Sequence, residues 1–186
     1  GLNAVVLSGH GGSTMHSVLE KREPVDIAAG LPFAMQDFNN EGALPHGEWH
    51  PVLTLLQQWM DPADPYSFAR QIADQPEAGQ NALDVFVPYG QADSYSPATT
   101  QEYYVRAGRF GQVDADASVS MADDIAITPV PSPLVDNVNG VTAGTRQYAN
   151  SSDDGHFVAF DVANANADVV RFLTQAVSGQ EPQVGP

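Results

Sequence analysis

Two polar residues in the second half of the chain, Asp93 and His156, have the types and surroundings of an acid–base pair. Asp93 lies in the turn Gly90-Gln91-Ala92-Asp93 after an apolar run, and His156 follows Asp154-Gly155 after another apolar run. A carboxylate that accepts the Nδ1–H of a histidine fixes its tautomer, so the other ring nitrogen can take a proton from a serine hydroxyl. We therefore expect Asp93 to orient His156, and His156 to act as general base and then as general acid.

The sequence contains no motif that identifies the serine nucleophile for such a pair. A Gly-x-Ser-x-Gly turn, which would present such a serine ahead of the pair, is absent from this sequence. We expect the nucleophile on a separate N-terminal chain or domain, which is the expected partner. Ser13 is a poorer candidate because the following glycine is missing. In a further interpretation, His10-Gly11-Gly12 is a loop whose backbone N–H groups face a developing negative charge.

Short apolar runs and amphipathic segments would position these residues. The runs at 2–8, 82–89 and 142–148 predict strands, and the segments at 14–21, 51–60, 65–72, 96–107 and 164–177 predict helices. Crossovers through helices return the chain in one direction, so the pattern predicts an α/β fold with a mostly parallel sheet and flanking helices. Three strands would leave a sheet edge bare, which suggests part of a larger fold.

The chain is expected to form one segment over 1–186. Residues 13–80 are expected to hold a lid-like insertion and helices, with mostly loop up to residue 50, and 81–179 the strands and helices that bear the acid and the histidine. Residues 109–140, rich in aspartate and proline, predict a surface loop, and 180–186 a tail.

Several apolar residues are candidates for an acyl-binding pocket. Trp59, on the helix expected at 51–60, and His10 are the two residues that we expect beside the substrate. Further candidates are Phe33, Phe38, Leu53, Leu56 and Met60. Apolar residues at helical spacing also arise in ordinary core helices, which is the alternative interpretation.

No cofactor and no metal are expected. His46 and His50 flank Glu48, but Pro45, Gly47 and Pro51 oppose the helix that a zinc site would need. Calcium ligands are conceivable among the loop carboxylates Asp114, Asp116, Asp123 and Asp124, or in Asp61 with Asp64. Because neither set follows a calcium-binding loop pattern, we interpret them as solvated or helix-capping carboxylates and leave calcium open.

Composition excludes several classes of protein. Seven basic and 23 acidic residues give a net charge of −16, which opposes binding to nucleic acid. Cysteine is absent, which rules out disulfides and thiolate sites, and no apolar run approaches the ~20 residues of a membrane span. The acidic composition is typical of an extracellular or cell-surface protein. A first residue other than methionine suggests a processed chain.

The order of the motifs carries a family resemblance. The segments are Val6-Leu7-Ser8-Gly9-His10-Gly11-Gly12, Lys21-Arg22-Glu23-Pro24-Val25-Asp26-Ile27, His50-Pro51-Val52-Leu53-Thr54-Leu55-Leu56-Gln57, Asp61-Pro62-Ala63-Asp64-Pro65 and the two motifs around Asp93 and His156. This series resembles the C-terminal half of bacterial secreted α/β-hydrolases of the lipase and esterase type. The resemblance implies that the first segment is the strand after the nucleophile turn and that the His-Pro and Asp-Pro segments belong to a lid-like insertion.

For function, the resemblance implies hydrolysis of carboxylic esters, of small esters or of lipids, outside the cell. Asp93 and His156 match the family's acid and histidine, whereas its nucleophile and oxyanion donor have no counterpart here. The alternative is a non-catalytic surface or assembly protein that retains a hydrolase scaffold, with residues 114–133 as contact surface.

Overall fold

A four-stranded, all-parallel sheet forms the centre of the computed structural model, which describes residues 1–113, 129–150 and 154–186. The strands are β1 (Ala4–Val6), β2 (Asp84–Gly90), β3 (Gly111–Gln112) and β4 (Ala143–Tyr148), in the order β1-β2-β4-β3. The predicted α/β class with a parallel sheet is confirmed. β3 was not predicted, because two residues are too short to show a strand pattern.

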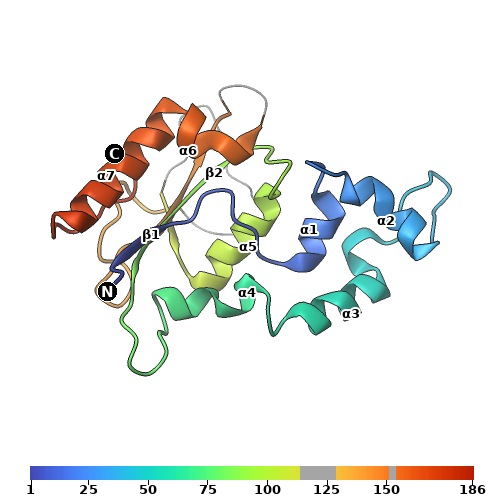
Figure 1. Cartoon of the computed structure of the whole chain (residues 1–186), viewed down its shortest axis with the longest axis horizontal. Coiled ribbons are helices and arrows are strands. Elements are labelled where there is room, and N and C mark those ends of the chain that lie inside the picture. The colour runs from blue at the N-terminus through green and yellow to red at the C-terminus, as the bar shows by residue number, and fades with distance from the viewer. Residues whose placement is uncertain (114–128, 151–153) are drawn as a thin grey trace.

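Helices cover the two faces of the sheet (Figure 1). One face carries α6 (Val158–Asp161) and α7 (Ala163–Val177), and the other carries α5 (Ala98–Gly108), α4 (Pro65–Phe68) and the 3-10 turn Ala69–Ile72.

Alternate residues of β2 enter two separate cores. Val85 and Val87 pack with Tyr104 of α5, whereas Phe86 packs with Phe172 of α7, because successive side chains of a strand point to opposite faces. β2 is therefore buried on both faces. This burial explains why its sequence is a continuous apolar run instead of an alternating one.

A helical extension projects from this body (Figure 1). It contains α1 (Thr14–Glu20), α2 (Ile27–Met35), the 3-10 turn Gly47–Trp49 and α3 (Pro51–Met60). We expected loop at α2, because its sequence contains Gly30 and Pro32. The helix nevertheless begins at a strong cap, since the Asp26 carboxylate accepts the backbone N–H of Ala29 at 2.8 Å.

The C-terminal residues do not form a free tail. Val184 is fully buried and exchanges two backbone hydrogen bonds with Leu134, at 2.9 and 3.1 Å. The expectation of a tail at 180–186 was therefore wrong. The same two hydrogen bonds hold the segment 129–140 against the C-terminal residues. The carboxylates Asp114, Asp116, Asp123 and Asp124 lie outside the described residues.

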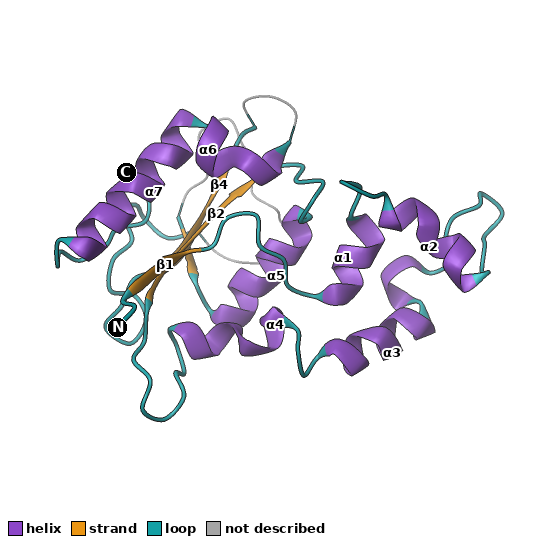
Figure 2. Cartoon of the chain, in the orientation of Figure 1, coloured by secondary structure: helices purple, strands orange, loops and turns teal. Residues whose placement is uncertain are grey.

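β1 is an edge strand, and among the described residues no strand pairs with its outer side (Figure 2). Leu2, just before β1, and Val177, at the end of α7, are 68% and 84% exposed. In the described parts of the chain, no helix has both the length and the apolar character needed to cross a bilayer.

Candidate functional site

Asp93 lies in the turn after β2, where four groups surround its buried carboxylate. Oδ1 accepts the backbone N–H groups of Tyr95 at 2.9 Å and Ser96 at 2.7 Å. Oδ2 accepts the side-chain amide of Gln101 at 2.9 Å and lies 3.2 Å from Nδ1 of His156. The first three donors fix the orientation of the carboxylate and leave Oδ2 directed at the imidazole.

Burial raises the pKa of the Asp93 carboxyl group above its ordinary value. The hydrogen bond from the Ser96 backbone and the charge and hydrogen bond of His156 act in the opposite direction but do not cancel this effect. A carboxylate that water solvates poorly attracts a neighbouring positive charge more strongly than an exposed carboxylate does. Asp93 is therefore placed to stabilise His156 when the imidazole takes up a proton.

Two loops that touch through their backbones hold His156 in place. The Asp154 carboxylate accepts the backbone N–H of His156 at 2.8 Å and that of Ser94 at 3.2 Å, and it also accepts the Ser94 hydroxyl. A Cβ added at Gly90 would lie 2.3 Å from the carbonyl oxygen of Gly155, and one added at Gly155 would meet backbone atoms equally closely. Both glycines are therefore needed for the loops to meet.

Neighbours on several sides restrict the imidazole ring. Tyr95 stacks on it at a centroid distance of 4.9 Å, and Phe157 contacts it edge-on, also at 4.9 Å. Gly9, which follows β1 with φ +61°, lies so close that a Cβ there would be 2.6 Å from Cε1 of His156. The side chain remains 24% exposed, and Nε2 has no hydrogen-bond partner among the described residues.

His10 packs against α5. Its ring contacts Tyr104 edge-on at a centroid distance of 4.5 Å, and both ring nitrogens are buried. Burial lowers the pKa of His10 to about 4, so the ring is neutral at physiological pH. Contact of His10 with a substrate therefore remains a prediction.

The loop that precedes α1 offers fewer oxyanion donors than its glycines suggested. Asp64 accepts the backbone N–H groups of Ser13 at 2.9 Å and Thr14 at 2.6 Å. These two donors are thus already occupied by a carboxylate. If this loop formed an oxyanion hole, the N–H groups of Ser13 and Thr14 would not be available as donors.

The structure also contains a serine–histidine pair that was not predicted. The Ser13 hydroxyl lies 2.6 Å from Nδ1 of His16, and Nε2 of His16 lies 3.4 Å from the Glu48 carboxylate. The sequence signal is the spacing of three residues within one helical turn. Ser13 and His16 are only 6% and 7% exposed, and Asp64 accepts the backbone N–H of Ser13 itself. We interpret this cluster as a contact that joins α1 to the 3-10 turn Gly47–Trp49.

Three of the apolar pocket candidates, Trp59, Phe33 and Phe38, lie on the surface of the helical extension, whereas Leu53 is buried and Leu56 and Met60 are half-buried. Trp59 is 77% exposed, and Phe33 and Phe38 contact each other at a centroid distance of 5.2 Å while both remain exposed. α3 packs on α1 and the 3-10 turn Gly47–Trp49, and Trp59 does not line the hollows beside Asp93 and Ser94. The structure therefore does not bring Trp59 together with Asp93 and His156.

The two histidines considered for zinc have other partners or positions. His50 begins α3, where Nδ1 accepts the backbone N–H of Val52 at 3.2 Å, and its Nε2 lies 3.2 Å from Asp37. His46 precedes the 3-10 turn with φ +65°. Within the described ranges, no group of three histidine, aspartate or glutamate side chains is arranged to hold a metal ion.

The arrangement at the carboxyl end of β2 can accept a proton at Nε2 of His156 and stabilise the resulting charge through Asp93. That chemistry suits the activation of a hydroxyl group or a water molecule. No protein-family model, curated protein or solved structure matches this chain.

Proposed function

We propose that this chain supplies the acid and the base of a serine hydrolase that acts on carboxylic esters. The observation that carries the proposal is the 3.2 Å approach of the Asp93 carboxylate to Nδ1 of His156. Asp93 holds the Nδ1–H tautomer, and Nε2 remains available to take a proton from a nucleophile and to return it to the leaving group.

The nucleophilic serine belongs, in this proposal, to a partner chain or domain. Ser94 and Ser96, which lie beside Asp93, already have partners: Ser96 donates to the carbonyl of Gly9 at 2.8 Å, and Ser94 donates to Asp154. A serine held near Nε2 would attack the ester carbonyl and form an acyl-enzyme. His156 would then activate the water molecule that releases the acid.

A fluorophosphonate probe, which forms a covalent bond with activated serines, tests the proposal directly. We expect labelling of a native preparation, followed by denaturing separation and mass analysis, to place the probe on a serine outside this chain. A label on Ser13 would contradict the location of the nucleophile. The absence of any label, with the partner present, would contradict the hydrolase proposal and favour the scaffold alternative.

Matched variants then test the two residues. In the assembled protein, Asp93→Asn is expected to lower kcat for a simple ester by roughly three to four orders of magnitude, because an amide no longer holds the productive histidine tautomer. Asp161→Asn, an exposed aspartate five positions after His156, is the control and should leave kcat unchanged. Equal activity of Asp93→Asn and the control would contradict the assigned role of Asp93.

The scaffold alternative has one observation in its favour. Trp49, Trp59 and Phe33, on the helical extension, are at least 70% exposed, and such residues are common in contact surfaces. The labelling experiment separates the two proposals, because a scaffold requires no activated serine.

A further inference from the structure

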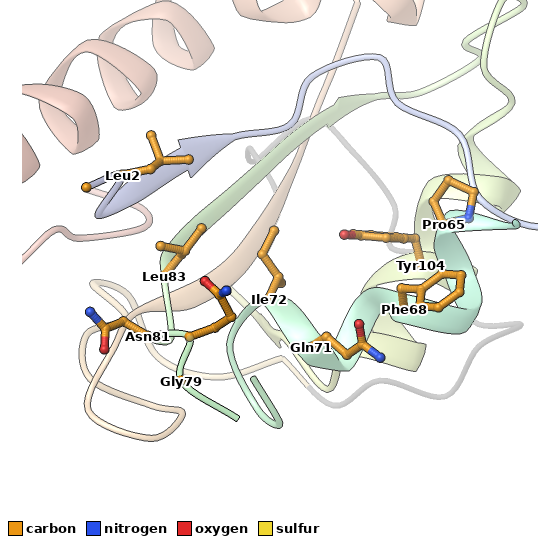
Figure 3. A pocket seen from close by; sticks show the side chains of 11 residues that line it. Leu2, Pro65, Phe68, Gln71, Ile72, Gly79, Asn81, Leu83 and Tyr104 are labelled. Carbon is orange, nitrogen blue, oxygen red and sulfur yellow. The ribbon is translucent and has the colours of Figure 1, made fainter. Parts of the chain in front are cut away.

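A pocket of about 630 Å³ opens on the α5 side of the sheet, near the amino ends of β1 and β2. Its apolar walls include Leu2 and Leu83, which precede these strands, Phe68 of α4 and Ile72 of the following 3-10 turn (Figure 3). Asp93 and His156 follow the carboxyl ends of the strands. The pocket is therefore separate from the proposed hydrolase site, and its size is in the range of pockets that bind small molecules.

The side chains that line the pocket are uncharged. Its lining contains the amide side chains of Gln71, Gln80 and Asn81 and the hydroxyl of Tyr104, and none of the lining side chains is a lysine, arginine, histidine, aspartate or glutamate. The whole protein has a net charge of −16. An anion would thus meet an unfavourable field, and no lining side chain offers it a positive charge, whereas a cation would lack a carboxylate inside the pocket.

Tyr104 is the polar group most firmly held in this lining. The residue is 94% buried, and its ring contacts His10 at a centroid distance of 4.5 Å and Phe110 at 5.9 Å. Figure 3 shows its oxygen directed across the pocket towards Ile72. Among the described residues, no hydrogen bond satisfies this hydroxyl. Burial raises its pKa, so it remains a proton donor at any physiological pH.

We propose that this pocket binds an uncharged, largely apolar small molecule whose single hydrogen-bond acceptor receives the Tyr104 hydroxyl. The apolar walls supply the affinity through removal of hydrocarbon surface from water, and the hydroxyl fixes the orientation. Medium-chain alcohols and neutral esters belong to this class. The proposal does not depend on the hydrolase activity, because the two sites lie at opposite ends of the strands.

A titration of the ¹⁵N-labelled protein with 1-octanol tests the proposal. We expect saturable shifts of backbone amide signals that concentrate at Ile72, Leu83 and Tyr104, with the signals of Trp49 and Trp59 unchanged. Octanoate has the same chain length but carries a charge, and its Kd should be at least about tenfold higher. Octanol shifts that concentrate on the exposed tryptophans, or equal affinity for octanoate, would overturn the proposal.

Single substitutions define the role of the hydroxyl. Tyr104→Phe removes one hydrogen bond and should raise the Kd for octanol roughly three- to tenfold, while the Kd for octanoate changes little. Tyr66→Phe, on α4 but facing a different hollow, should leave both values unchanged. Octanol binding by Tyr104→Phe with unchanged affinity would overturn the assignment of the hydroxyl.

A second variant guards against an effect on folding. Ile72→Trp places a large side chain in the half-buried pocket wall and should abolish octanol binding, while the amide signals of α7 remain at their wild-type positions. Octanol binding that survives this change would overturn the assignment of the pocket.

Discussion

At the scale of single residues, burial disfavours the negative charge of Asp93, whereas the proposed function requires it. Removal of its carboxylate from water makes the charged form costly, yet the proposed chemistry needs that charge beside His156. The three hydrogen bonds from Tyr95, Ser96 and Gln101 reduce this cost without removing it. Asp93 therefore has the features of a residue retained for function at some expense of stability.

This opposition predicts a particular pH dependence of stability. The folded-state pKa of Asp93 is raised above the ordinary value of 3.8, so the folded state holds the proton more tightly than the unfolded state does. Its contribution is full below the ordinary pKa and is lost as the pH rises through the raised value. The free energy of unfolding of the wild type, relative to Asp93→Asn, should decrease in urea titrations as the pH rises above the ordinary pKa of an aspartate.

A variant of His156, which contacts the Asp93 carboxylate, provides the control. His156→Ala removes an influence that lowers the pKa of Asp93, so it should make this pH dependence steeper. A wild-type advantage over Asp93→Asn that grows with pH would show that the hydrogen bonds outweigh burial.

At the scale of elements, Asp64 joins three helices through one buried carboxylate. It accepts the Ser13 and Thr14 N–H groups at the start of α1, the Gln57 amide of α3 at 3.0 Å and the Tyr66 N–H of α4 at 3.1 Å. Burial alone would raise its pKa, but the hydrogen bonds from Gln57, Thr14 and Ser13 together lower it. Asp64 thus helps to attach the helical extension to the sheet domain.

Asp64→Asn should therefore destabilise the protein by roughly 2–4 kcal/mol in urea unfolding, because an amide presents a donor to groups that are themselves donors. Asp61→Asn is the matched control, since Asp61 accepts the Gln57 amide from a position that is only partly buried. Because the pKa of Asp64 is lowered, its contribution is present above pH 3.8 and should disappear as the pH falls through the lowered value. Equal effects of the two substitutions would contradict this role.

At the scale of the whole molecule, charge repulsion opposes the compact state. The seven basic residues cannot neutralise the 23 acidic residues, and several are already committed to local pairs such as Arg70–Asp74 and Arg146–Asp168. Salt screens the remaining repulsion. Stability should therefore increase with ionic strength.

We expect Tm to rise by roughly a few degrees between about 10 mM and about 200 mM NaCl, measured by circular dichroism. KCl at equal ionic strength should give the same rise, because screening does not depend on the identity of the cation. A lower Tm at high salt would indicate that attractive ion pairs dominate instead.

The sequence by itself determined the α/β class, the three longer strands and the nomination of Asp93 and His156, because these depend on local patterns: apolar runs, helix starts and turns after strands. It missed α2, where a side-chain cap outweighs the unfavourable Gly30 and Pro32, and β3, which exists only because β4 lies beside it.

Only the tertiary structure decided which groups meet. The 3.2 Å contact between Asp93 and His156, the occupation of the Ser13 and Thr14 N–H groups by Asp64 and the place of Tyr104 in the pocket lining all depend on segments far apart in sequence. Such contacts follow from the order of strands in the sheet and from close backbone approaches at Gly9, Gly90 and Gly155, which a local pattern does not encode.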